Sequence, residues 1–257
     1  MEFLTTNIIN TTTQIQVNSN TGTAANLFNR SKLYQFYSDG LNNDATTCSI
    51  QITFDATTSV SRLALLDTNF KEFSIFYNGA TASTFTLVGG DTTSSSYTAN
   101  ADEYKYFRFS TIQCSSITIN AKTTIVANNE KRLGQFVIAD LYYALTLIPS
   151  AKSYKPKKVP KQVVHKLSDG GTRVHNISSK WSIDFGLDYL SAADRDELFE
   201  IYDAGIAFNF APFGTTTSWD GLMFEAAWDG TFEFYQYSDN AAASGFSGKV
   251  SLEETPT

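Results

Sequence analysis

The sequence has 257 residues, which is enough for one large domain or two ordinary ones with a buried core. Its formal charge of −7 argues against general nucleic-acid binding, which needs a basic face to release counterions. Two cysteines, Cys48 and Cys114, are too few for a disulfide scaffold and favour a reducing compartment. No apolar run is long enough for a signal peptide or a membrane helix, so we expect no membrane insertion.

The first 150 residues predict an antiparallel β-sandwich. Short runs of alternating apolar and polar residues lie between segments rich in Ser, Thr, Asn, Asp and Gly, as is typical of strands joined by turns. No helical pattern separates these runs, and this indicates antiparallel packing. The predicted strands are SIQITF at 49–54, FSIFYN at 73–78, TFTLVG at 84–89, YKYFRF at 104–109 and SSITIN at 115–120.

Residues 20–146 resemble a discoidin-type, galactose-binding-like jelly roll in the order and spacing of their strands. The segments that carry this resemblance are AANLFNRSKLYQFYSDG, SIQITF, SVSRLALLDTNFKEFSIFYNG, EYKYFRFS, SSITINAKT and EKRLGQFVIADLYYAL. Asn29 and Arg30 stand where sugar-binding members tend to have Asp-Gly, and Phe36 or Tyr37 fills a position that is often Trp. The resemblance therefore implies the fold but does not extend to sugar binding.

The loop SDGLNND at 38–44 contains three oxygen donors, Asp39, Asn42 and Asp44. Loops of jelly rolls sometimes hold a calcium ion with such side chains. A plain polar turn is the commoner use of the same composition. The loop is thus a weak calcium candidate, and the sequence predicts no cofactor.

Charge divides the chain near residue 150. Residues 1–150 hold 9 basic and 11 acidic residues, whereas 167–257 hold 4 basic and 15 acidic ones. Between them, KSYKPKKVPKQVVHK at 152–166 has six lysines, two prolines and no acid. We expect an exposed linker at 151–162, between a domain at 1–150 and another at 163–257. A compatible interpretation is a basic arm whose lysines bind an acidic neighbouring subunit, with these candidates: Lys155, Lys157 and Lys158.

A hairpin is predicted next, because QVVHKL and TRVHNI flank the turn SDGG. His165 and His175 fall on its two strands. A cross-strand metal pair is conceivable, but no third ligand is nearby, and strand histidines that face solvent or a neighbour are far commoner.

KWSIDFGLDYL at 180–190 is the clearest strand signal. Its apolar side chains share one face, which we expect in the core: Trp181, Ile183, Phe185, Leu187 and Tyr189. Asp184 and Asp188 lie on the other face, about 13 Å apart at about 3.3 Å per residue, beyond the usual separation of a glycosidase carboxylate pair. We interpret them as a solvated strand face.

A helix is predicted over 191–204. Ser191 can cap it with Asp194 three residues later, and Gly205 can end it in a left-handed conformation. Its apolar residues recur at helical spacing and should cover a sheet or the open side of a small barrel: Leu198, Ile201 and Tyr202.

Alternating strands follow, with turns predicted at Asp220-Gly221 and Asp229-Gly230. Trp219 and Trp228 precede these turns. Both could stack on a sugar, but such residues more often close a hairpin and pack against a core edge.

Residues 160–255 resemble the tail-tube-like β-barrel domains of distal-tail and related baseplate or minor tail proteins of tailed bacteriophages. The resemblance is carried by GGTRVHNISSKWSIDFGLDYLSAADRDELFEIYDAGIAFNFAPF and by FSGKVSLEET. It implies a small antiparallel β-barrel with the helix packed outside it. It also implies a ring of copies, assembled through sheet edges and extended loops.

Catalytic motifs are absent: SGFSG has the wrong spacing for a nucleophile elbow, and neither a phosphate-binding glycine motif nor H-E-x-x-H occurs. We therefore expect a mainly β, non-enzymatic structural component of a phage tail that joins the tail tube to peripheral parts as a distal-tail, adaptor or baseplate ring. It would work in the virion after assembly in the host cytoplasm, with its own copies and other tail proteins as partners. The acidic surplus of 167–257 would suit a passage along which DNA slides. A carbohydrate-binding host-attachment protein is the alternative, with a host glycan as partner, and a hydrolase is a third class.

Overall fold

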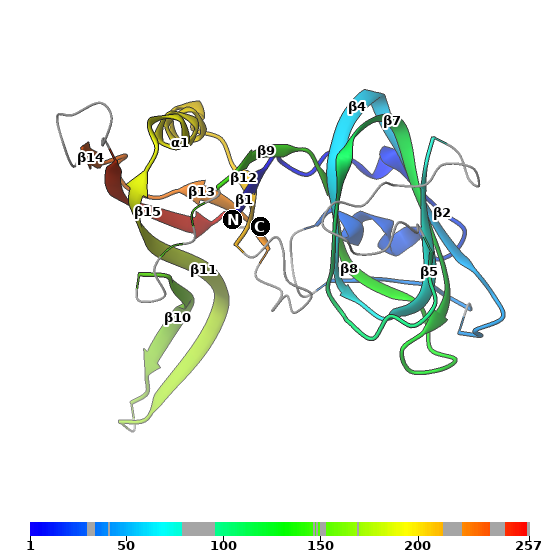
Figure 1. Ribbon diagram of the computed structural model, residues 1–257. Coiled ribbons are helices and arrows are strands. Elements are labelled where there is room, and N and C mark those ends of the chain that lie inside the picture. The colour runs from blue at the N-terminus through cyan, green and yellow to red at the C-terminus, as the bar shows by residue number, and fades with distance from the viewer. Residues whose placement is uncertain are drawn as a thin grey trace. The chain divides into compact units, whose positions relative to one another are not determined.

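The structure is a computed structural model that describes residues 1–29, 34–40, 42–78, 96–145, 147, 149, 153–168, 170–212, 223–236 and 245–255. The chain divides into two compact units, each with its own sheet and core (Figure 1). The sandwich unit comprises Leu4–Tyr142, Pro212–Leu222 and Thr257; the helix unit comprises Met1–Phe3, Tyr143–Ala211 and Met223–Pro256. The protein is mainly β with antiparallel pairing, which confirms the predicted fold class.

The sandwich unit contains a seven-stranded sheet. Its strands are β2 (Ile15–Val17), β3 (Phe36–Tyr37), β4 (Cys48–Thr68), β5 (Phe70–Tyr77), β6 (Ser96–Tyr97), β7 (Lys105–Thr124) and β8 (Arg132–Ala139). They run in the order β3-β8-β4-β7-β5-β6, with β2 beside β4. Two short 3-10 helices, η1 (Thr12–Gln14) and η2 (Thr21–Leu27), precede the sheet's long strands.

The long strands β4 and β7 each merge segments that the sequence predicts as separate. YKYFRF and SSITIN both lie in β7, and SIQITF continues into the rest of β4. Register shifts between Thr53 and Thr58 and between Val60 and Arg62 interrupt the β4–β7 pairing, and such bulges let one strand bend between two layers. Figure 1 shows β8 and β5 on opposite sides of this unit, joined by the curved β4 and β7. The predicted strand TFTLVG lies outside the described residues.

The core of the sandwich unit follows the period-2 alternation of its strands. Ile50 and Ile52 of β4 face Ile119 and Ile117 of β7 in register, and all four are buried. Cys48 and Cys114 are free and buried in the same core, and burial raises the pKa of each thiol to about 11. Both cysteines therefore act as small apolar residues, as the sequence indicates.

The helix unit contains an eight-stranded sheet. Its strands are β1 (Glu2–Leu4), β9 (Leu141–Ala144), β10 (Lys155–Lys166), β11 (Thr172–Leu190), β12 (Phe208–Ala211), β13 (Phe224–Trp228), β14 (Phe234–Gln236) and β15 (Phe246–Glu254). The path β10-β11-β15-β13-β12-β1-β9 has two ends, and β14 pairs with β15.

The domain boundaries differ from the predicted ones at both ends of 1–150. Strands β1 and β9 belong to the sheet of the helix unit, although the sequence places them in the first domain. The physical reason is Phe3, which is fully buried and whose ring centroid lies 5.5 Å from Phe208 and 5.3 Å from Phe210. A non-local aromatic contact thus recruits the first residues into this core.

The predicted linker at 151–162 is wrong where the structure describes it, because Lys155–Lys166 is strand β10. It pairs with β11 from Lys155↔Asp184 to Lys166↔Thr172, with one register shift after Lys161. Pro156 and Pro160 fit because β10 is the edge strand of the sheet, where a missing backbone N–H removes no ladder bond. The segment therefore extends the hairpin that the sequence predicts farther along.

The apolar face of β11 largely enters the core, as predicted. Ile183, Phe185 and Leu187 are buried and Trp181 packs partly against them. Tyr189 does not follow: it is 74% exposed, because the β11–β15 register shifts between Leu187 and Leu190 and Tyr189 adopts a φ of 61°. Leu190 is buried in its place.

The helix α1 (Ala192–Ala204) confirms the predicted helix. The Ser191 side chain accepts a hydrogen bond from the backbone N–H of Asp194 at 3.1 Å, and Gly205 ends the helix with a φ of 60°. Leu198 and Ile201 are buried against the sheet, whereas Tyr202 is half-buried. None of the helices that the structure describes is long and apolar enough to cross a membrane.

Candidate functional site

The helix unit has an exposed β10–β11 hairpin, whose residues 155–180 we call the arm. Figure 1 shows the arm extending away from the rest of the sheet, on the side opposite to α1. Its turn closes as predicted for SDGG: the Leu167 N–H donates to the Gly171 carbonyl at 2.7 Å, and Gly170 has a φ of 83°. At about 3.3 Å per residue, β10 reaches about 40 Å.

The arm has no core of its own. Every residue of β10 is exposed, and Val164 (55% exposed) stands directly opposite Val174 (53% exposed). Further exposed apolar side chains on the arm are Val159, Val163, Leu167 and Ile177. A two-stranded hairpin is marginally stable in water, and apolar side chains gathered on such a surface mark a contact site. The arm therefore exposes apolar side chains on a hairpin that buries little of its own surface.

The predicted assembly lysines lie at the base of the arm, and two of them are bound within the chain. The Nζ of Lys157 donates to Asp184 Oδ2 at 2.8 Å, and the Nζ of Lys158 lies 5.9 Å from the Trp181 ring centroid. Lys155 is exposed. The base lysines are thus placed to hold the arm on its own sheet.

Further basic side chains, which sequence reasoning did not single out, lie farther along the arm. Lys161, Lys166 and Arg173 are exposed and have no carboxylate partner among the residues that the structure describes. Two of them stand in the same lysine run, so the signal was present in the sequence. Which lysines are distal depends on the pairing register, which the sequence does not display.

Asp184 corrects the prediction of a solvated strand face. Its side chain is only 20% exposed and accepts hydrogen bonds from Lys157 and from Ser251 Oγ at 2.7 Å, with Lys249 Nζ at 3.0 Å. The hydrogen bond from Lys157 holds the pKa of this carboxyl below its usual range, against the opposing effect of burial. Asp188 is exposed, as predicted, and accepts from Ser247. Both carboxylates are therefore engaged with other partners.

The two predicted hairpin histidines do lie together on the arm. The ring centroids of His165 and His175 are 5.8 Å apart with an edge-to-face tilt. Within the described part of the chain, no group of three His, Cys, Asp or Glu side chains is placed to hold a metal ion. The arrangement is that of a cross-strand aromatic pair.

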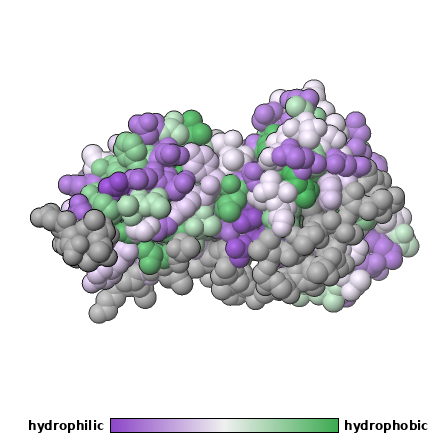
Figure 2. Space-filling view, turned by 45° about the horizontal axis from the view of Figure 1, so that its top comes forward, coloured by the Kyte–Doolittle hydropathy of each residue, from purple (hydrophilic) through white to green (hydrophobic). Residues whose placement is uncertain are grey.

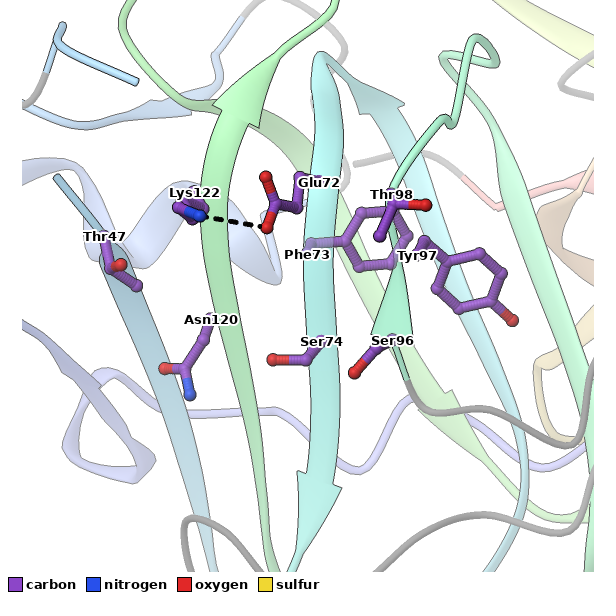
Figure 3. A pocket seen from close by; sticks show the side chains of 9 residues that line it. All are labelled: Thr47, Glu72, Phe73, Ser74, Ser96, Tyr97, Thr98, Asn120 and Lys122. Atoms are coloured by element: carbon purple, nitrogen blue, oxygen red, sulfur yellow. Dashed lines mark hydrogen bonds and ion pairs between the residues drawn. The ribbon is translucent and has the colours of Figure 1, made fainter. Parts of the chain in front are cut away.

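The sandwich unit carries a shallow hollow of about 170 Å³ on the sheet of β5, β6 and β7. Figure 3 shows Asn120, Ser74 and Ser96 in a row across these three strands, and their registers place them opposite one another. Two residues after Asn120 in β7, Lys122 Nζ lies 3.2 Å from Glu72 Oε1. Sequence reasoning missed this hollow, because its side chains come from segments far apart in the chain.

Among the described residues, the aromatic side chains of this hollow are set apart from its row of polar ones. Phe73 and Tyr97 also line it, but they alternate with Glu72, Ser74 and Ser96, and their rings stack on each other at 4.9 Å. Phe73 is buried in the core, so this pair belongs to the inner side of the sheet. The polar side chains that line the hollow thus offer hydrogen-bond donors and acceptors, while its two described aromatic rings stack on each other.

The weak calcium candidates lie in a loop that already holds a positive charge. The buried Lys131 donates from Nζ to the Asn43 carbonyl at 2.8 Å, and burial lowers its pKa while Asp44 opposes that shift. Asp44 Oδ1 also accepts from the Thr124 N–H and hydroxyl. Asp39 and Asn42 are exposed. These contacts favour the interpretation as a polar turn.

Trp228 packs at a core edge, and Gly230 takes a φ of 92° in the predicted turn. The indole N–H of Trp228 is buried with no acceptor among the described residues. Trp219 and the Asp220-Gly221 turn lie outside the described residues.

No protein-family model and no curated protein matches the chain. Among solved structures, it is similar to chitosan-binding module 1 of a chitosanase/glucanase from Paenibacillus sp. IK-5, with 13% identity, a TM-score of 0.41 and coverage of 52% of this chain and 98% of the module. It is also similar to module 2 of the same enzyme, in complex with chitotriose, with 18% identity, a TM-score of 0.37 and coverage of 48% of this chain and 93% of the module. A fucosidase from Ruminococcus gnavus is similar with 11% identity, a TM-score of 0.38 and coverage of 49% of this chain and 25% of the fucosidase. The similar structures are thus mostly carbohydrate-binding modules, and none of these three is a tail protein.

Proposed function

We propose that this protein is a non-enzymatic structural subunit that assembles with its own copies through the arm. The observation that carries the proposal is the exposure of the arm's apolar side chains on a hairpin with no core of its own. Folding such a segment without a partner orders backbone for little burial. Docking it on another subunit would supply the missing burial.

In its finer form, the proposal places the subunit in the tail of a bacteriophage, as a distal-tail, adaptor or baseplate component that joins the tube to peripheral parts. Its support is the sequence resemblance of residues 160–255 to tail-tube-like domains. The element order agrees with that resemblance, since a long strand runs into a capped helix and a short aromatic strand follows. The protein would then act in the virion, after assembly in the host cytoplasm.

Assembly through sheet edges is less favoured than assembly through the faces of the arm. The β10 edge carries Pro156, Pro160 and several lysines, which are features that natural edge strands use to prevent pairing with another chain. The exposed valines and isoleucine instead project from the faces of the hairpin. We therefore expect side-chain packing at the contact.

The test is sedimentation of the wild type beside a chain with a shortened arm. Replacing residues 160–179 by Asn-Gly keeps the Val159↔Lys180 pair and closes it with a two-residue hairpin turn. The shortened chain should melt like the wild type but sediment as a monomer where the wild type forms a larger species. A shortened chain that assembles like the wild type would overturn the proposal.

Saccharide binding by the sandwich unit is the second candidate function, and the hollow beside Asn120 is the observation that favours it. Asn120, Ser74, Ser96 and the Glu72–Lys122 pair could donate to and accept from sugar hydroxyls. A glycan array followed by calorimetry with Asn120→Ala tests it. Binding that Asn120→Ala weakens at least tenfold would support this function, whereas an array with no hits would remove it.

A further inference from the structure

The helix unit has a second exposed apolar surface, on the side of α1. We call it the aromatic patch, and it consists of Phe199, Tyr202, Trp228, Phe232 and Phe234. The Phe232 ring centroid lies 5.3 Å from Phe199, 5.5 Å from Tyr202, 5.7 Å from Trp228 and 4.7 Å from Phe234. Phe199 is 47% exposed and the other four are half-buried. Figure 2 turns the α1 side forward, and green hydrophobic and purple hydrophilic residues lie side by side on that part of the view.

Carboxylates are sequence neighbours of the patch residues, both on α1 and in the segment 228–234. Glu200 and Asp203 adjoin Phe199 and Tyr202 on α1, and Asp229 and Glu233 adjoin Trp228 and Phe232. All four carboxylates are exposed, and none forms an ion pair within the part of the chain that the structure describes. The two segments that form the patch therefore carry four exposed carboxylates without an ion pair, while Arg195, one turn before Phe199 on α1, pairs with Asp196 and lies over the ring of Phe246.

We propose, building on the assembly role above, that the aromatic patch of one copy receives the arm of a second copy. The two surfaces are complementary in their apolar side chains and in their charge. Val164, Val174 and Ile177 on the arm offer aliphatic side chains to the exposed rings. Lys161, Lys166 and Arg173 offer cations to the carboxylates and to the faces of the rings, and no acid on β10 opposes them.

The geometry of the helix unit makes this contact intermolecular. Figure 1 shows the arm and α1 on opposite sides of the sheet, and no ring contact or ion pair of the described residues joins arm and patch within one chain. Donor and receiver are different surfaces, so each contact joins the arm of one copy to the patch of another. Such a contact produces a closed ring or an open filament when it repeats in one direction, or a symmetric dimer when two copies exchange arms.

The test uses two single-cysteine variants of the full chain, Val164→Cys on the arm and Glu200→Cys beside the patch. The native Cys48 and Cys114 are buried and give little background. A short bis-maleimide is added to each variant alone, to a mixture of the two, and to a mixture of Val164→Cys with Val126→Cys, an exposed position in the sandwich unit. Sedimentation of every sample is recorded at the same concentration.

We expect a covalent dimer in the Val164→Cys and Glu200→Cys mixture at least tenfold above the other samples. Assembly without this product would overturn the docking of arm on patch while leaving the assembly role intact. A dimer of Val164→Cys alone would indicate arm-to-arm contact, and a dimer with Val126→Cys would indicate docking on the sandwich unit; either overturns the proposal. Sedimentation as a monomer throughout would overturn the assembly role itself.

A charge exchange tests the electrostatic half of the contact independently. Lys161→Glu with Lys166→Glu should weaken assembly, and so should Glu200→Lys with Asp203→Lys. The four changes combined should restore assembly to within about threefold of the wild type, because opposite charges face each other again. Failure of the combined variant to recover, in a chain that melts like the wild type, would show that these charges do not meet.

Discussion

The Nζ atom of Lys157 lies 2.8 Å from Oδ2 of Asp184 and fastens the base of the arm to its own sheet. Because this contact holds the folded-state pKa of Asp184 below its usual range, it stabilises the fold above about pH 4 and its contribution is lost as pH falls toward the folded pKa. Asp184→Asn should therefore reduce the free energy of unfolding by about 1 kcal/mol at pH 7.

Melts of wild type and Asp184→Asn between about pH 7 and pH 2 check this prediction. The difference between the two should shrink as the pH falls below about 4. Asp55→Asn is the matched control, since Asp55 is exposed and has no ion pair among the described residues. A difference that stays constant across this range would contradict the account of Asp184.

Trp181 anchors the strand where the arm meets the core, so its loss should be felt in stability. It packs against the core of the helix unit while remaining half-exposed. Trp181→Ala should lower the free energy of unfolding by about 2–3 kcal/mol, below the range for a fully buried Trp. Ile206→Ala, at a position 61% exposed, should change it by about 0.5 kcal/mol or less. Denaturant titration measures both free energies of unfolding. Equal losses for Trp181→Ala and Ile206→Ala would mean that Trp181 contributes no core packing.

Ser191, the N-cap of α1, should be sensitive to substitution. Its hydroxyl satisfies the backbone N–H of Asp194 at the start of the helix. Ser191→Ala should reduce stability by about 1 kcal/mol, whereas Ser191→Asp should retain most of it because aspartate also caps helices. If both variants melt alike, the cap is not what stabilises this end of the helix.

The lysines of the arm should report assembly to a protease. In dilute, unassembled protein, trypsin should cleave first within 155–173, since the hairpin is exposed and opens easily. Assembled protein should be cut there at least tenfold more slowly, while cleavage at Lys249, which is also exposed, should not change. Equal cleavage of the arm in both states would place the arm outside the interface.

Local signals in the sequence were sufficient for the helix and for the apolar face of β11, because caps and periodicity act within a few residues. Ser191, Gly205, Ile183 and Phe185 all take their predicted places. Non-local pairing was not accessible in this way. Phe3 joins strands more than 200 residues away, and the lysine run at 155–161 resembles a linker because its partner strand shows only in the register with β11.

The same distinction between local signals and non-local pairing applies to the candidate site. The basic character of the arm was visible as a run of lysines, but the sequence did not reveal which lysines are held at its base by Asp184 and Trp181. Tyr189 was misplaced because a bulge at a positive φ leaves no mark in an alternating pattern. The hollow beside Asn120 is assembled from distant strands, which one sequence without covariation does not connect.

Hydrogen exchange of the arm's backbone amides, measured as protein concentration rises, tests most directly the claim that a partner completes the arm. At low concentration, the amides of 155–180 should exchange fast, because no core protects them. At concentrations where sedimentation shows assembly, they should slow by at least tenfold, together with amides of α1. Fast exchange of the arm in the assembled protein would contradict the account.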